Sequence, residues 1–72
     1  MDIIASRFHG IVREFDRNRG LGTIELDNGE NVSVRYSAII GEGVRILRSG
    51  DRVACDVEVT HKGSCAVRVE RE

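Results

Sequence analysis

The chain has 72 residues, of which 11 are basic and 12 are acidic, and its formal net charge is −1. A chain of this length forms one small domain, and its balanced charge excludes a strong overall attraction to nucleic acid. Such binding would need a local basic patch, and all but one of the basic residues are arginines, whose guanidinium groups favour forked contacts to phosphate.

Composition also bears on the cellular compartment. No apolar run approaches the ~20 residues that span a bilayer, and Met1-Asp2-Ile3-Ile4 lacks the basic leader and apolar core of a signal peptide. We therefore expect a cytoplasmic protein without membrane contact, in which Cys55 and Cys65 are reduced. These cysteines and the scattered His9 and His61 do not have the spacing of a metal site, so we expect no metal and no cofactor.

The first strand is predicted over residues 8–15, where apolar residues recur and Gly10 indicates a bend or bulge. Residues 1–7 have no clear period and are predicted to be a mobile end or an extra edge segment. A polar turn that includes an asparagine and a glycine is expected at residues 16–20.

The strongest local signal is Asn28-Gly29, which favours a type I′ hairpin turn because both central residues of that turn need positive φ. The turn would join strands at residues 21–26 and 32–36, in which apolar and polar residues alternate. The exposed face of the second strand carries Ser33 and Arg35. The buried face is predicted to hold Ile24, Leu26, Val32, Val34 and Tyr36.

Beyond the hairpin, residues 37–40 are predicted to form a short helical turn capped by Ser37, and residues 41–43 a loop. A further turn is expected at residues 49–51. The clearest alternation in the chain then follows at residues 52–59. It predicts an inward face of Val53, Cys55, Val57 and Val59.

The last strand, residues 65–69, pairs back on this one through a turn at residues 60–63. In that register Cys65 lies opposite Glu58, and Cys55 is offset from Cys65 by about three residues. The offset, ~10 Å along the strand, exceeds the reach of a disulfide, so two thiols are expected. The alternating apolar set of this strand is Cys65, Val67 and Val69.

Five short β-type runs separated by turn signals, with no proline and no long amphipathic helix, predict an all-β fold. We expect residues 1–72 to form a small five-stranded antiparallel barrel as a single domain. Closure of the barrel would remove strand edges that so short a chain could hardly cover otherwise.

Spaced motifs run along nearly the whole chain, from Gly10 to Val69. They are Gly10-Ile11-Val12-Arg13, Gly20-x-Gly22-x-Ile24, Val32-x-Val34-x-Tyr36-Ser37-Ala38-Ile39, the Gly43 and Leu47 spacing up to Gly50, Val53 and Lys62-Gly63. In this order and spacing they resemble the bacterial cold-shock domain. The resemblance implies an OB-fold barrel that binds single-stranded nucleic acid.

The stacking aromatics of that family are largely replaced in this chain. Only Phe15 and Tyr36 remain as rings at those positions, and Glu14 brings a negative charge to the expected path of the phosphates. Because one base stacked on a ring is worth ~1–3 kcal/mol, the replacements imply weakened binding. Three segments differ from the family pattern. Arg13-Glu14-Phe15 stands where the family has Lys-Trp-Phe, and Gly20-Leu21-Gly22-Thr23 stands where it has Gly-Phe-Gly-Phe. Val32-Ser33-Val34-Arg35-Tyr36 stands where it has Val-Phe-Val-His-Phe.

The candidate site consists of basic and aromatic residues near this face. On one interpretation, guanidinium planes partly replace the lost rings and their forks bind phosphate. On the other, the arginines form a solvated surface paired with Glu14, Asp16 and Glu25, and the two rings pack at the barrel rim. Gly20 and Gly22 are expected to serve close packing rather than a phosphate cradle, because no helix follows them. The candidate nucleic-acid-binding residues are Arg13, Phe15, Arg17, Arg19, Arg35, Tyr36 and Lys62.

The predicted function is weak, largely sequence-independent binding of single-stranded RNA or DNA, in the regulation of transcription or translation. No nucleophile, base and orienting residue occur in a recognisable spacing, so we expect no enzyme. One alternative is a cold-shock domain that has lost nucleic acid and binds a protein partner, or forms a weak homodimer, through Leu21 and its neighbours. Another is a ribosome-binding OB protein similar to translation initiation factor one, which has a run like Glu25-Leu26-Asp27-Asn28-Gly29.

Overall fold

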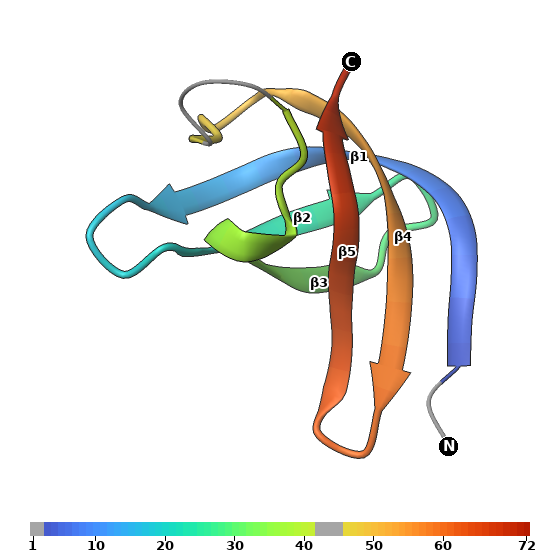
Figure 1. Cartoon of the computed structure of the whole chain (residues 1–72). Helices are drawn as coiled ribbons and strands as arrows, with labels where there is room; N and C mark the ends of the chain where they lie inside the picture. The colour runs from blue at the N-terminus through green and yellow to red at the C-terminus, as the bar shows by residue number, and fades with distance from the viewer. Residues whose placement is uncertain (1–2, 42–45) are drawn as a thin grey trace.

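A computed structural model describes residues 3–41 and 46–72. Its strands close into a barrel in the order β1-β2-β3-β5-β4, which confirms the predicted all-β, five-stranded barrel (Figure 1). Met1, Asp2 and the predicted loop at residues 42–43, with the Gly43 of the cold-shock pattern, lie outside the described residues. The elements are β1 (Ile3–Asp16), β2 (Leu21–Leu26), β3 (Asn31–Arg35), the 3-10 helix η1 (Tyr36–Ala38), β4 (Arg52–Thr60) and β5 (Gly63–Arg71).

Neighbouring strands pair antiparallel except at one seam. β1 pairs with β2 and β4, β2 with β3, and β4 with β5, all in antiparallel fashion. The barrel closes between β3 and β5, which run parallel and pair at Ser33 and Cys65. This seam is the one exception among the strand pairs to the predicted antiparallel pairing. Around a closed ring with an odd number of strands, alternating directions cannot be completed, so one neighbouring pair must be parallel.

β1 belongs to both halves of the barrel and bends sharply between them (Figure 1). Gly10 lies at the junction and pairs both with β2 and with β4. A Cβ at Gly10 would lie 2.6 Å from the carbonyl oxygen of Glu25, so the glycine permits a close approach of β2. The predicted bend is present, but the bulge is not at Gly10, because the register of β1 against β2 shifts between Val12 and Glu14.

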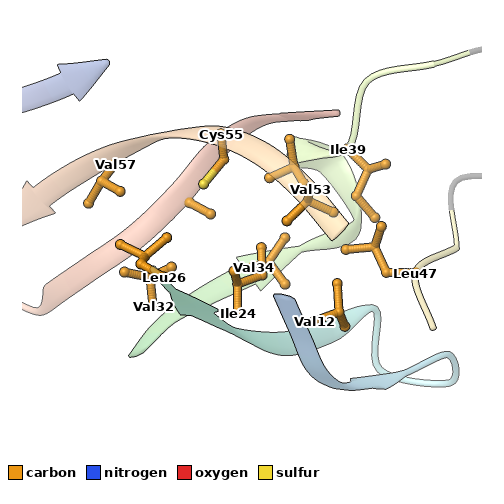
Figure 2. Packing of buried hydrophobic residues seen from close by; sticks show 12 residues of the cluster. Val12, Ile24, Leu26, Val32, Val34, Ile39, Leu47, Val53, Cys55 and Val57 are labelled. Atoms are coloured by element: carbon orange, nitrogen blue, oxygen red, sulfur yellow. The ribbon is translucent and has the colours of Figure 1, made fainter. Parts of the chain in front are cut away.

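The core consists of small and aliphatic side chains from all five strands, together with Ile39 and Leu47 from the chain between β3 and β4 (Figure 2). Burying one aliphatic side chain of this size stabilises a fold by ~1.5–3 kcal/mol, so the barrel depends on these positions staying apolar. The set includes the inward positions predicted for β2 and the first three predicted for β4. Its members are Val12, Ile24, Leu26, Val32, Val34, Ile39, Leu47, Val53, Cys55, Val57, Ala66 and Val69.

The hairpin between β2 and β3 is present, but its turn is not type I′. Gly29 has a φ of 91°, whereas Asn28 does not have a positive φ. The Gly29 N–H donates to the Leu26 carbonyl, and the Leu26 N–H donates to the Glu30 carbonyl, each at 2.8 Å. Residues 27–29 therefore form a longer loop, in which a type I turn is followed by a left-handed glycine. The Asn28 side chain favours this loop because its Oδ1 accepts the Glu30 N–H at 2.9 Å.

Tyr36 does not continue the buried face of β3, which ends at Arg35. The chain turns into η1 at Tyr36, whose N–H donates to the Gly20 carbonyl at 2.8 Å and whose side chain is 52% exposed. The predicted helical turn is present but begins one residue earlier. Ser37 does not cap it, because the N-cap residue is Arg35 and no side chain caps that end. At the C-terminal end, the Ile39 N–H donates to the Tyr36 carbonyl.

An extra residue in β5 changes which of its side chains face the core. Arg68 has a φ of 51° and lies in a β-bulge, where β5 has two residues opposite one residue of β4. Ala66 faces the core before the bulge, and Val69 faces it afterwards. Cys65 and Val67, which were predicted to face inward, are only partly buried. The simple alternation predicted for this strand is therefore wrong before the bulge.

Both faces of β4 are covered over much of its length. Ala54 and Asp56 alternate with the predicted inward positions, yet both are buried, with Asp56 only 6% exposed. The Oδ2 atom of Asp56 lies 3.7 Å from Nη1 of Arg68, so the bulge of β5 places a cation beside the buried carboxylate. Val59 was predicted to face inward but is 43% exposed near the end of β4.

The two cysteines occupy different environments in the β4–β5 hairpin. Cys65 pairs with Glu58, as predicted, and its thiol donates to the Glu58 carbonyl at 3.7 Å. Cys55 is fully buried in the core (Figure 2). Both residues are thiols, in agreement with the predicted offset that places a disulfide out of reach.

We expect a maleimide reagent to label Cys65 faster than Cys55 in the native protein, because Cys55 reacts only when the core opens. Mass spectrometry of digested samples taken at successive times measures the two rates, and a Cys65→Ser variant isolates the slow one. If Cys55 reacted at the rate of an unfolded peptide thiol, β4 would be assigned to the wrong face.

Candidate nucleic-acid interface

The outer face of β1, β2 and β3 carries positions at which the cold-shock resemblance places stacking rings. Residues paired across these strands form three rows on this surface, and none of the rows contains an aromatic ring. The central row has one carboxylate and two hydroxyl groups, so this surface provides charge and hydrogen bonds in place of stacking. The rows are Ile11–Glu25–Asn31, Glu14–Thr23–Ser33 and Asp16–Leu21–Arg35.

Arg13 joins this face through the irregularity in β1. It is the extra residue between Val12 and Glu14, and Ser49 holds its backbone by donating a hydroxyl hydrogen bond to its carbonyl at 2.9 Å. The Nη1 atom of Arg13 lies 3.2 Å from Oε1 of Glu25. An ion pair this exposed contributes little to stability, so Arg13 can exchange Glu25 for a phosphate at small cost. The neighbouring Glu14 nevertheless keeps the local charge from being positive.

Arg35 and Tyr36 form the exposed end of the face where β3 passes into η1. Arg35 pairs across the strands with Leu21, which is 45% exposed, and it forms no ion pair with any described residue. The backbone hydrogen bond from Tyr36 to Gly20 holds Tyr36 in place. Gly20 has a φ of 67°, which suits a glycine, and a Cβ added there would lie 3.1 Å from the Tyr36 Cβ. A cation, a half-exposed ring and an apolar side chain are therefore neighbours here.

Phe15 lies apart from Tyr36. It pairs with Gly22 near the end of β1 and packs, half-buried, against the core. A Cβ on Gly22 would lie 2.7 Å from Cδ1 of Phe15, so Gly22 serves close packing, as predicted. Because the Phe15 ring supports the barrel end, the two remaining rings do not form one exposed platform.

The other predicted site residues are spread over two turns. Arg19 lies in the turn between β1 and β2, where its Nε is 3.9 Å from Oδ2 of Asp16. Arg17 lies in the same turn but lines a hollow at the barrel end together with Phe15. Lys62 lies in the turn between β4 and β5. The seven predicted residues therefore do not form one continuous site.

A groove of ≈ 720 Å³ connects Lys62 to the face. It runs between β3 with η1 on one side and the β4–β5 hairpin on the other, and Arg35 and Lys62 both line it. Ser33 and Arg68 also line it. Sequence reasoning missed Arg68 as a site residue, because the groove that it lines forms only where β5 comes beside β3 and η1 in the closed barrel.

Other chemically active groups lie away from this face. The Nδ1 atom of His9 is 2.8 Å from Oε1 of Glu72, and this hydrogen bond, helped by the charges of His9 and Arg52, holds the pKa of Glu72 below its usual value despite an opposing desolvation effect. The stabilisation from a lowered carboxyl pKa is present above the pKa of the unfolded state and is lost as the pH falls through the pKa of the folded state.

Within residues 3–41 and 46–72, no three metal-ligating side chains cluster, and no helix has the length and apolarity to cross a membrane.

The closed five-stranded barrel, with an exposed three-stranded face that bears arginines, is the architecture of the OB class of nucleic-acid-binding domains. The family model described as the 'Cold-shock' DNA-binding domain matches residues 8–72. The chain therefore belongs to the cold-shock domain family, as the resemblance predicted. Members of this family bind nucleic acid and are not enzymes, which confirms the prediction that this chain is not an enzyme.

Named relatives cover most of the chain. Cold shock protein CspC of Bacillus subtilis (strain 168) is 39% identical over 62 residues, which cover 86% of this chain and 94% of the relative. The major cold shock protein of Streptococcus pyogenes serotype M1 is 37% identical over 62 residues, 86% of this chain and 92% of the relative. Cold shock-like protein CspE of Bacillus anthracis is 38% identical over 60 residues, 83% of this chain and 90% of the relative.

We expect Glu25→Gln to strengthen the binding of a single-stranded oligonucleotide about threefold at low salt. The change removes one negative charge from the face and releases Arg13 from its ion pair, and a unit charge about 7 Å away is worth ~0.6 kcal/mol in water. Fluorescence anisotropy measures the affinity. Glu70→Gln, the same change of charge on β5 outside the three rows, is the matched control. Equal effects of both substitutions would show that only net charge matters.

Proposed function

We propose that this protein binds single-stranded RNA or DNA on the outer face of β1, β2 and β3, weakly and with little sequence preference. The observation that carries the proposal is the exposed end of this face in a cold-shock barrel, where Arg35 forms no ion pair with a described residue and Tyr36 is half-exposed. Arg13, Arg19 and Lys62 would add phosphate contacts around it.

Weak binding follows from what the face has lost. Each base stacked on an aromatic ring is worth ~1–3 kcal/mol. The central row offers Glu14, Thr23 and Ser33 in place of rings, and Phe15 packs half-buried against the core at the barrel end rather than standing on this face. Several stacking contacts are therefore absent, and affinity would depend mainly on arginine contacts to phosphates.

Low sequence preference follows from the same chemistry. Phosphates are identical at every position of a strand, so arginine–phosphate contacts position the ligand without reading its bases. Tyr36 would stack on any base, because every base has a π-face. We further propose that the protein acts in the cytoplasm on transcription or translation, where single-stranded segments occur.

A second candidate function has one specific observation in its favour. Leu21 and Tyr36, 45% and 52% exposed, lie at the same end of the face, and an exposed apolar pair of this kind also suits a protein partner or a weak homodimer. The family match over residues 8–72 favours nucleic acid, and it also favours a cold-shock role over one similar to translation initiation factor one.

The substitutions Arg35→Ala and Tyr36→Ala separate the two parts of the proposed interaction, the phosphate contact and the base stacking. We expect Arg35→Ala to weaken binding of all oligonucleotides and to reduce the slope of log affinity against log salt by about 0.7, the loss of one phosphate contact on a single strand. Tyr36→Ala should leave the slope nearly unchanged and cost no more than the ~1–3 kcal/mol of one stack. Fluorescence titrations of a pyrimidine-rich oligonucleotide at several salt concentrations measure both quantities.

Arg52→Ala is the matched control, because Arg52 pairs with Asp27 at 3.6 Å, outside the three rows. It should change the slope much less than Arg35→Ala does. Absence of salt-dependent binding by the unmodified protein at low ionic strength would contradict the proposal. The protein-binding alternative would then be preferred, and analytical ultracentrifugation would test for a homodimer.

A further inference from the structure

A hollow of ≈ 810 Å³ lies at the end of the barrel, outside the three rows of the face. Three separate parts of the chain line it: the turn after β1, the segment that leads into β4, and the end of β5. Each part contributes one arginine, namely Arg17, Arg48 and Arg71, and the apolar lining includes Phe15 and Leu47.

The arginines make this hollow more cationic than the face. Asp51 is the only carboxylate among its described lining residues, against three guanidinium groups. The Oδ2 atom of Asp51 accepts the Arg48 backbone N–H at 3.0 Å, so this carboxylate is engaged in fixing the turn. The side chains of Arg17 and Arg48 form no ion pair with any described residue. On the face, by contrast, Arg13 is paired with Glu25.

The floor of the hollow is apolar. Leu47 is fully buried, and Phe15 is half-buried between the core and this surface. Phe15 also lines a smaller hollow of ≈ 350 Å³ with Leu21 and Thr23, which belong to the rows of the face. Phe15 is therefore shared by the two surfaces, and a single strand of nucleic acid that lies on the face can continue past this ring.

We propose that this hollow is a second contact site for single-stranded nucleic acid, in which Arg17 and Arg48 bind backbone phosphates and a base rests on Phe15. Guanidinium forks match the geometry of phosphate oxygens, and an apolar ring accepts the flat surface of any base. The proposal rests on the proposed function, since it extends the same strand from the face to the barrel end. It assigns to Arg17 and Phe15 a place separate from that of Arg35 and Tyr36.

A length dependence of affinity follows. A strand of about four nucleotides, near the lower limit for one OB barrel, is too short to occupy both surfaces, whereas one of about nine nucleotides can reach both. The longer strand should therefore gain phosphate contacts that the shorter one lacks. The double substitution Arg17→Ala/Arg48→Ala should remove that gain, and because both side chains are exposed the barrel should stay folded.

Backbone amide shifts in nuclear magnetic resonance spectra distinguish the two surfaces during titration with oligothymidylate of about nine nucleotides at low salt. Amides of Arg17, Arg48 and Ser49 report on the hollow, and those of Thr23 and Ser33 report on the face. We expect both sets to shift in the unmodified protein. In Arg17→Ala/Arg48→Ala only the face set should shift, with affinity reduced about tenfold, as for a lost charge-assisted contact.

The control Arg52→Glu changes the net charge by the same two units outside the hollow and outside the three rows, and it should retain the shifts of the hollow amides. Face shifts without hollow shifts in the unmodified protein would overturn this inference and leave the proposed function standing. Hollow shifts without face shifts would support the hollow and contradict the proposed role of the face. Absence of both would overturn the two proposals together.

Discussion

The hydrogen bonding of β1 along both of its edges is the constraint on which the rest of the structure depends. At Gly10 the strand pairs with β2 on one side and β4 on the other, and any side chain there would collide with the Glu25 carbonyl. From this junction β1 runs into the irregularity at Arg13, which Ser49 fixes from the segment before β4. That irregularity turns both Arg13 and Glu14 outward, so a cation and an anion of the face follow from the path of one strand.

The core of the barrel and the proposed binding surface are built from different residues. The core is built from inward positions that are all apolar, whereas the central row of the face is outward and bears Glu14, Thr23 and Ser33. Replacing a ring by a polar residue at such a position removes no core contact, so the fold can persist while stacking is lost. What remains is arginine chemistry, which is screened by salt with a Debye length of about 8 Å at physiological ionic strength. Nucleic-acid binding by this surface should accordingly depend strongly on ionic strength.

The sequence predicted those features that depend on period and spacing. The alternation around Val53 and Cys55 placed both residues in the core, and the hairpin register placed Cys65 opposite Glu58. It could not predict features that one extra residue decides. The bulge at Arg68 has no glycine to signal it, and it reverses the expected alternation before it. Tyr36 fitted the buried period of β3, but a backbone hydrogen bond to the distant Gly20 turns the chain there. The inward packing of Phe15 and the barrel-end hollow likewise arise from contacts between separate segments.

The most direct test of the central claim, that this face still binds nucleic acid with its stacking term reduced, is the oligonucleotide affinity of Glu14→Trp relative to Glu14→Gln. Both variants remove the negative charge beside Arg13, and only the first restores a ring to the face. Glu14→Gln should strengthen binding about threefold, as for one like charge at ~7 Å in water, and Glu14→Trp should add the ~1–3 kcal/mol of one stacked base. Equal affinities of the two variants, or a Trp variant that binds no better than the parent, would contradict the account.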